Sequence, residues 1–241
     1  DPAAPEETRE RITASHYHYG YELTGKRSAV PHVAASDDYL VDASTSDGSI
    51  VIFVPGDLFG VDSTTTRTVD GGGIGTLSLS EATIMADDRL VAGTRQGATL
   101  VADLYDRLLI CAAAEMLGVM EAALDLALGY VKTREQFGRP IGSFQALQHR
   151  AGDDHMEIEL TRSLLYQVCR AIDAGHGNRS LAAAVNARAS EAVLSVTKSA
   201  IQMHGAIGFT DEYDAGLYLR RAMTLAALHG NASYQRNRYA M

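Results

Sequence analysis

The stretch LLICAAAEMLGVMEAALDLALGYVKTREQF, residues 108–137, decides the fold of the second half of the chain. Its alanines and leucines recur at spacings of three and four residues, which is the periodicity of a helix that buries one side. Pro140 follows shortly afterwards, and a proline there prevents the helix from continuing. The pattern therefore predicts a long amphipathic helix that ends in the segment Arg134–Gly138.

Three further segments have the same helical spacing. The first, residues 143–175, runs to a stopping glycine, Gly175, and the others span about 179–203 and 213–229. Four helices that each carry an apolar stripe imply a bundle. We therefore expect residues 97–241 to form a four-helix-bundle domain.

The first part of the chain, residues 1–96, has a different texture. Short runs rich in Thr, Ser and Val alternate apolar with polar residues, and turn signals lie at 46–49 and 69–75. The glycines at 71–75 are followed by TLSLS, which is typical of a strand, so a glycine-rich hairpin is favoured over a phosphate loop. These features predict an antiparallel β-domain and an α+β fold for the whole chain.

Composition and charge exclude several classes of function. The 241 residues carry a net charge of −9, whereas a nucleic-acid-binding surface requires a basic face. The apolar run LLICAAAEMLGVM contains Glu115 and is too short to span a bilayer. The N-terminal residues lack the apolar core of a signal peptide. We expect a cytoplasmic protein that binds neither nucleic acid nor membrane.

Two groups of potential metal ligands are better explained without a metal. His16 and His18 alternate as they would on one face of a strand, but a third ligand at useful spacing is missing. The helical cluster at 153–155 (Asp153, Asp154 and His155) points in different directions, because adjacent residues on a helix lie about 100° apart. We predict that this cluster is a solvated face and that the chain holds no metal.

Two corners between helices are candidate binding sites. Arg134 and Phe137 precede Pro140 at the first corner, where an arginine and backbone amides suit a pyrophosphate and an exposed aromatic suits a flat ring. The second corner contains Gly205 and Gly208, which allow a close approach to the backbone. Both corners are equally consistent with ordinary turns on these grounds alone.

Two longer motifs, YVKTREQFGRPIGSFQALQHR (130–150) and IQMHGAIGFTDEYDAGLYLRR (201–221), resemble the acyl-CoA dehydrogenase family. Members have an N-terminal helical domain, a middle β-domain and a C-terminal four-helix bundle, and this chain is similar to the last two. The resemblance implies α,β-dehydrogenation of an acyl-CoA, with a carboxylate base and FAD as hydride acceptor. It also implies FAD contacts, made across a subunit interface, for Arg134, Phe137, Gln145, Gln202 and Gly205.

The resemblance also has departures. The family's Trp-Ile-Thr, which packs on the flavin ring, corresponds to residues 29–31, Ala-Val-Pro, and proline lacks a backbone N–H. The glutamate base that many members carry corresponds to His229. In a minority of members the base lies on the first bundle helix, which corresponds to Leu108, with Asp106 two residues away.

Three functions are compatible with this pattern. The favoured function follows from a resemblance to the base-lacking subunit of the actinobacterial α2β2 acyl-CoA dehydrogenases of steroid side-chain breakdown, which implies a partner subunit that carries the base. A homo-oligomeric dehydrogenase that uses His229 or Asp106 as base is the second reading. A flavin-free scaffold protein on the same fold is the third.

Overall fold

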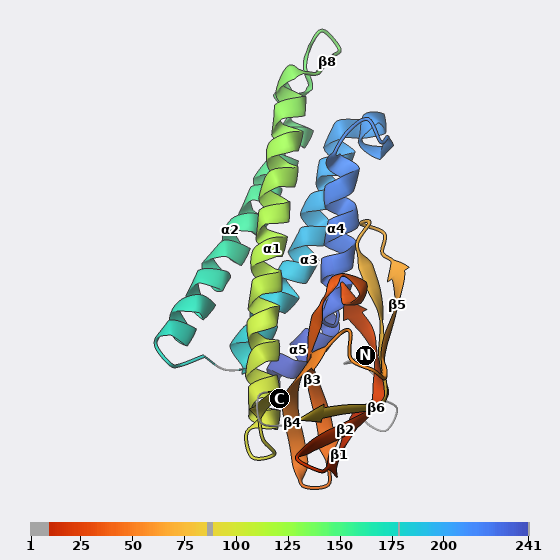
Figure 1. Cartoon of the computed structure of the whole chain (residues 1–241). Coiled ribbons are helices and arrows are strands. Elements are labelled where there is room, and N and C mark those ends of the chain that lie inside the picture. Colours follow the sequence, from red (N-terminus) through yellow and green to blue (C-terminus); the bar gives the residue numbers. More distant parts are fainter. Residues whose placement is uncertain (1–9, 86–88, 178, 241) are drawn as a thin grey trace. The chain divides into compact units, whose positions relative to one another are not determined.

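The computed structural model describes residues 10–85, 89–177 and 179–240. The chain divides into two compact units, residues 1–105 and 106–241, and helix α1 begins in the first unit and continues into the second. The expected β-domain and helical bundle are both present, in that order (Figure 1). The expected domain boundary at 96/97 stays a prediction.

Seven strands form one sheet in the first unit, in the spatial order β5-β6-β2-β1-β3-β4-β7. The strands are β1 (Ile12–Tyr17), β2 (Gly20–Pro31), β3 (Asp38–Thr45), β4 (Gly48–Pro55), β5 (Val61–Arg67), β6 (Gly73–Met85) and β7 (Leu90–Ala92). A short 3-10 helix, η2 (Val33–Ala35), lies between β2 and β3.

One strand pair makes the sheet mixed. β1 pairs parallel with β3, with Ile12 opposite Ala43, and the other strand pairs are antiparallel. The chain passes from β2 to the far side of β1 before it forms β3. Alternation of residues reports which face of a strand is buried but not which strand lies beside it, so this pairing was not visible in the sequence. The predicted glycine-rich hairpin is confirmed: residues 68–72 form the turn between β5 and β6, and residues 73–75 already belong to β6.

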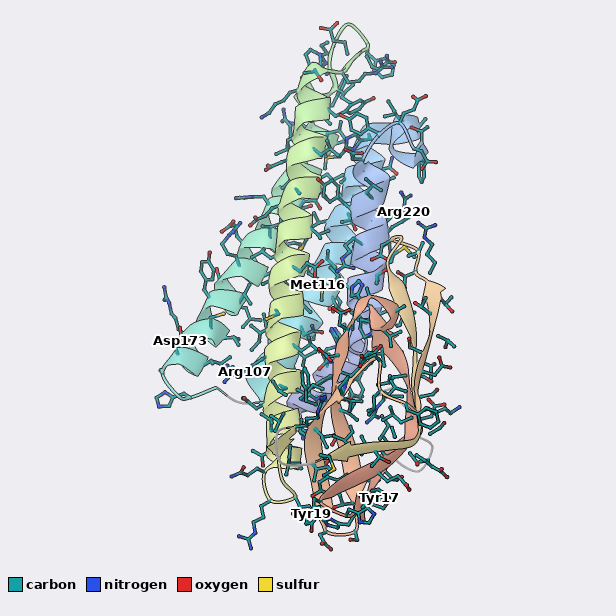
Figure 2. All side chains as sticks on the ribbon, in the orientation of Figure 1. Tyr17, Tyr19, Arg107, Met116, Asp173 and Arg220 are labelled. Atoms are coloured by element: carbon teal, nitrogen blue, oxygen red, sulfur yellow. The ribbon has the colours of Figure 1, made fainter. Side chains whose placement is uncertain are left out.

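Alternate residues of the strands build the core of this unit. On β4, Ile50, Ile52 and Val54 are fully buried on one face, and Val51 between them is also buried; on β1 and β3 the buried residues alternate. By contrast, Tyr17 and Tyr19 at the β1–β2 turn are exposed (Figure 2). The period-two pattern that predicts the strands therefore also indicates which face of β1 and β3 is buried.

Five α-helices follow. They are α1 (Gly97–Thr133), α2 (Gln145–Asp173), α3 (Arg179–His204), α4 (Ala215–Leu228) and α5 (Ala232–Ala240). Between α1 and α2 lie two short strands, β8 (Glu135–Gln136) and β9 (Arg139–Pro140), and the 3-10 helix η3 (Ile141–Ser143). The 3-10 helix η4 (Gly205–Phe209) follows α3. The four predicted helices are confirmed, with ends that differ by a few residues.

Helix α3 is central to the second unit. It carries many buried residues, most of them small, and it packs against α2, α4 and α5. From α1, Met116 is also fully buried (Figure 2). Ion pairs join neighbouring helices at the surface of the bundle: Arg162–Glu121, Arg188–Glu157, Arg221–Glu115 and Arg236–Glu191.

Two features of the bundle differ from the expectation. Helix α5 was not predicted, because its sequence, ASYQRNRYA, is too polar to show an apolar stripe. The prediction that residues 153–155 form a solvated face is wrong for Asp154, whose exposed fraction is 5%. The Ser199 hydroxyl on α3 donates to its carboxylate at 2.5 Å, so a polar partner on the neighbouring helix makes this burial possible.

Candidate functional site

The corner between α1 and α2 is a hydrogen-bonded, solvent-facing turn. The Arg134 backbone N–H donates to Tyr130 at the end of α1, and its carbonyl accepts from Ile141 at 2.8 Å. Two residues of β8 and two of β9 pair to form the turn, whose tip carries Phe137 in a left-handed conformation (φ 54°). The Phe137 side chain is 91% exposed. An aromatic ring held this far into solvent by a fixed turn is available to a ligand or a second chain.

A second aromatic and a second arginine belong to the same corner. The Phe144 ring lies 6.0 Å from the Phe137 ring, edge to face, and the Arg139 guanidinium lies 4.2 Å from the centre of the Phe144 ring. Gln145 is the exposed first residue of α2, where the helix dipole favours negative charge. Sequence reasoning missed Arg139 and Phe144, although both lie inside the motif at 130–150.

The turn after α3 lies beside this corner. His204 is buried, its Nδ1 lies 2.6 Å from the Ala200 carbonyl, and its ring packs 4.8 Å from the ring of Tyr130 on α1. The Tyr213 ring covers His204 from another side at 4.7 Å. These contacts place the end of α3 against the end of α1, as Figure 1 also shows.

Gln202 and Gly205 flank His204 and are both exposed. Gly205 has φ 65°, and a Cβ at that position would meet no neighbouring atom within 4 Å. The structure therefore places the five residues predicted to contact a cofactor at one end of the bundle, all exposed: Arg134, Phe137, Gln145, Gln202 and Gly205. A cation, an aromatic ring and an open glycine turn together suit an anionic group attached to a flat ring.

His229 lies at the other end of α4. The 14 residues of that helix separate it from the η4 end by about 21 Å. Burial lowers the pKa of the His229 imidazole below its ordinary value, which favours the neutral ring. The structure thus does not bring His229 together with the five exposed residues.

The two candidate positions on α1 have different surroundings. The Leu108 side chain is 46% exposed and carries no group that could remove a proton. Asp106 accepts a hydrogen bond at 2.9 Å from Arg238 on α5, in an ion pair whose side chains are 21% and 9% exposed, respectively. Asp106 is therefore engaged by a cation that sequence reasoning did not anticipate.

Residues 29–31 form the end of β2. Val30 and Pro31 pair with Gly75 and Ile74 of β6, across an irregularity in the register, and Ala29 has a left-handed backbone (φ 58°). Pro31 has no N–H to donate, and none of the three side chains carries a hydroxyl. This segment therefore does not fit the hydrogen-bonding platform for a flavin ring that the resemblance implied.

Within the residues that the structure describes, no three His, Cys, Asp or Glu side chains are placed so that they could hold a metal ion. No helix in the same ranges combines the length and hydropathy needed to cross a bilayer. An open pocket of about 670 Å³ lies at the start of α1, lined by residues between 91 and 103, and contains none of the predicted site residues.

Comparison with known proteins agrees with this architecture. The family model described as "Acyl-CoA dehydrogenase, C-terminal domain" matches residues 96–241, which is more than half of the chain. This chain belongs to the acyl-CoA dehydrogenase family.

Three relatives illustrate the likeness. Acyl-CoA dehydrogenase FadE27 of Mycobacterium tuberculosis is 31% identical over 91% of this chain and 60% of its own length. The ChsE4-ChsE5 complex from the same organism has a chain that is 31% identical, with a TM-score of 0.88, covering 98% of this chain and 63% of that one. The Tcur3481-Tcur3483 steroid ACAD G363A variant gives 30% identity and a TM-score of 0.86, covering 96% and 62%. The chain thus spans about three fifths of the length of these relatives.

Proposed function

We propose that this chain is a subunit of an FAD-dependent acyl-CoA dehydrogenase that lacks the carboxylate base and completes the FAD site of a partner subunit. One observation carries the proposal: the chain keeps the residues matched to FAD contacts but not the carboxylate base or the segment matched to the flavin platform. The five residues matched to FAD contacts are exposed at one end of the bundle, whereas the base position holds His229. The segment matched to the flavin platform ends in Pro31.

The residues at the bundle end have distinct roles in this proposal. The Arg134 guanidinium pairs with a pyrophosphate oxygen, and Phe137 covers a flat ring. Gln145 and Gln202 supply amide hydrogen bonds, and the turn at Gly205 lets the backbone approach the adenine end. When bound, FAD supplies the hydride acceptor for the reaction. The partner subunit supplies the base and the surface for the flavin ring.

Two of the similar structures support a partner subunit. The ChsE4-ChsE5 complex and the Tcur3481-Tcur3483 steroid ACAD are each named for two different proteins. We propose by analogy an α2β2 assembly that acts on an acyl-CoA, with a steroid side-chain CoA as the candidate substrate. One competent flavin site per heterodimer follows, because each site needs residues from both subunits.

The test is the visible absorption spectrum of this protein purified alone and after co-expression with a glutamate-bearing dehydrogenase subunit. Flavin bands are expected in the co-purified complex and not in the chain alone. Bleaching of those bands by an acyl-CoA would then identify the substrate. Flavin bands from the chain alone, bleached by an acyl-CoA, would overturn the proposal.

A homo-oligomeric dehydrogenase is the second candidate, because His229 is half-buried and its lowered pKa favours the neutral imidazole that a general base requires. The purified chain would then turn over an acyl-CoA by itself, and His229→Ala would abolish that turnover. Asp106, the other candidate base, is engaged by Arg238. A flavin-free scaffold, the third candidate, predicts that the co-purified complex also lacks flavin bands.

A further inference from the structure

Helix α5 buries polar side chains that no function yet described explains. Gln235 is 0% exposed and Arg238 is 8% exposed, although the helix is short and polar. A charged residue is rarely buried unless it is paired, and an unpaired buried amide is also costly. These two residues must therefore have partners that repay their removal from water.

Their partners form a continuous chain of hydrogen bonds. The Arg238 guanidinium donates from Nη2 to Asp106 Oδ1 at 2.9 Å and from Nη1 to Gln235 Oε1 at 3.1 Å. The Gln235 amide then donates from Nε2 to the His229 carbonyl at 2.5 Å. The chain of bonds thus joins α1, α5 and the residue that ends α4.

Residues of α5 also contact the loop between α4 and α5 at Gly230 and Asn231. The side-chain oxygen of Asn231 accepts a hydrogen bond from the Tyr234 backbone N–H at 2.9 Å. The backbone carbonyl of Asn231 accepts one from the Gln235 backbone N–H at 3.0 Å. Gly230 has φ 88°, and a Cβ there would meet the Tyr234 ring at 2.5 Å. The backbone from the His229 carbonyl to Asn231 is therefore contacted by groups on α5.

We propose that Asp106, Arg238 and Gln235 are positioning residues that fix His229 at the end of α4, and that Asp106 is the counter-ion of a buried arginine and not a base. The hydrogen bonds of this network all lie within this one chain. Their role in a dehydrogenase site rests on the proposed function, because His229 occupies the position that corresponds to the family's base.

The donor and acceptor groups of Arg238 and Gln235 explain why these residue types form the network. A guanidinium presents several donors in a fixed plane, so one Arg238 orients both an acidic group on α1 and an amide on its own helix. The side-chain amide of Gln235 has both an acceptor and a donor, so it accepts from Arg238 and at the same time donates to the His229 backbone carbonyl. A lysine or an apolar residue would not reproduce both connections.

The experiment uses the isolated, isotope-labelled chain and needs neither flavin nor partner, so its failure is distinct from failure of the proposed function. NMR titration follows the pKa of the His229 imidazole in the wild type and in Gln235→Met, which keeps side-chain length but removes both hydrogen bonds. The expected result is a rise of the His229 pKa toward its ordinary value. Amide exchange at Gly230, whose N–H donates to the Ala227 carbonyl, should accelerate by up to about tenfold, which is the effect of losing one hydrogen bond.

Arg236→Gln is the matched control, because Arg236 lies on the same helix and pairs with Glu191 at the surface. It should change neither readout. A Gln235→Met chain with wild-type His229 pKa and exchange rates would overturn the proposal.

A second measurement covers the case in which Gln235→Met does not fold. Asp106→Asn, Arg238→Gln and the double variant form a thermodynamic cycle for the ion pair. The double variant should be destabilised by less than the sum of the single variants, because each single variant leaves a buried partner behind. Additive losses would show that the two side chains do not act together and would overturn the proposal.

Discussion

Asp154 is a buried carboxylate in the middle of α2, and burial raises the pKa of this group above its ordinary value. The Ser199 hydroxyl and the nearby Arg150 act in the opposite direction, whereas Asp153 and Glu157 add to the rise. A carboxyl whose folded pKa is raised stabilises the fold in its protonated form. That contribution is fully present below the unfolded value of 3.8 and is lost as pH rises through the folded pKa.

Asp154→Asn removes the charge and keeps an oxygen that accepts from Ser199. We expect the free energy of unfolding of Asp154→Asn, relative to wild type, to increase as pH rises from about 4 to about 7. Urea denaturation at several pH values measures this difference. Asp153→Asn, at the exposed neighbouring position, is the comparison variant and should show only a smaller gain, because Asp153 adds to the rise of the Asp154 pKa without being buried itself. A difference for Asp154→Asn that stays constant with pH would contradict the prediction.

The His229 imidazole has the opposite dependence. Its folded pKa lies below 6.5, so the unfolded chain takes up the proton first as pH falls. The wild type should therefore lose stability as pH falls through about 6.5, and His229→Asn should lose less over the same interval. Chemical denaturation of both proteins across this range measures the effect. Parallel losses in the two proteins would show that His229 is not responsible.

Among the secondary-structure elements, β6 has the most demanding steric requirement near the core. A Cβ at Gly75 would lie 1.7 Å from the Thr64 carbonyl oxygen of β5, which is backbone and cannot rotate away. The glycine is therefore required by the close approach of two strands, although in the sequence it looked like one member of a glycine-rich turn.

Gly75→Ala should destabilise the first unit by about 1–3 kcal/mol, the range for overpacked sites. Thermal unfolding followed by circular dichroism measures the loss. Gly93→Ala is the matched control in the same unit, because a Cβ there would meet no atom within 4 Å and Gly93 has no left-handed φ. Equal effects of the two substitutions would contradict the steric explanation.

At the scale of the whole molecule, the proposed assembly predicts which exposed residues matter. Arg134→Ala should lower the flavin-to-protein ratio of the co-purified complex, because it removes a charge-assisted contact of about 1.5–3 kcal/mol. Lys132→Ala is the control, since Lys132 is an exposed cation in the last turn of α1, two residues before Arg134. Absorbance of flavin and protein in the purified complex measures the ratio. Equal flavin content in both variants would remove Arg134 from the site.

Much of the architecture was predictable because it depends on local periodicity. The period of two on the strands and the three-and-four spacing on the helices identified both units and four of the five α-helices. The candidate residues Arg134 and Gly205 were predictable as corner residues, since prolines and glycines interrupt helices wherever they occur. Helix α5 escaped because its buried residues, Gln235 and Arg238, are polar and leave no apolar stripe.

The sequence by itself determined the two-part organisation and the family of this protein, because hydrophobic spacing and short motifs are properties of neighbouring residues. Only the tertiary structure decided that β1 lies parallel to β3, that Asp154 is buried against Ser199, and that Asp106 is paired with Arg238. Each of these facts joins residues far apart in the chain. Their contact energies depend on where packing places the elements, and local pattern carries no record of that placement.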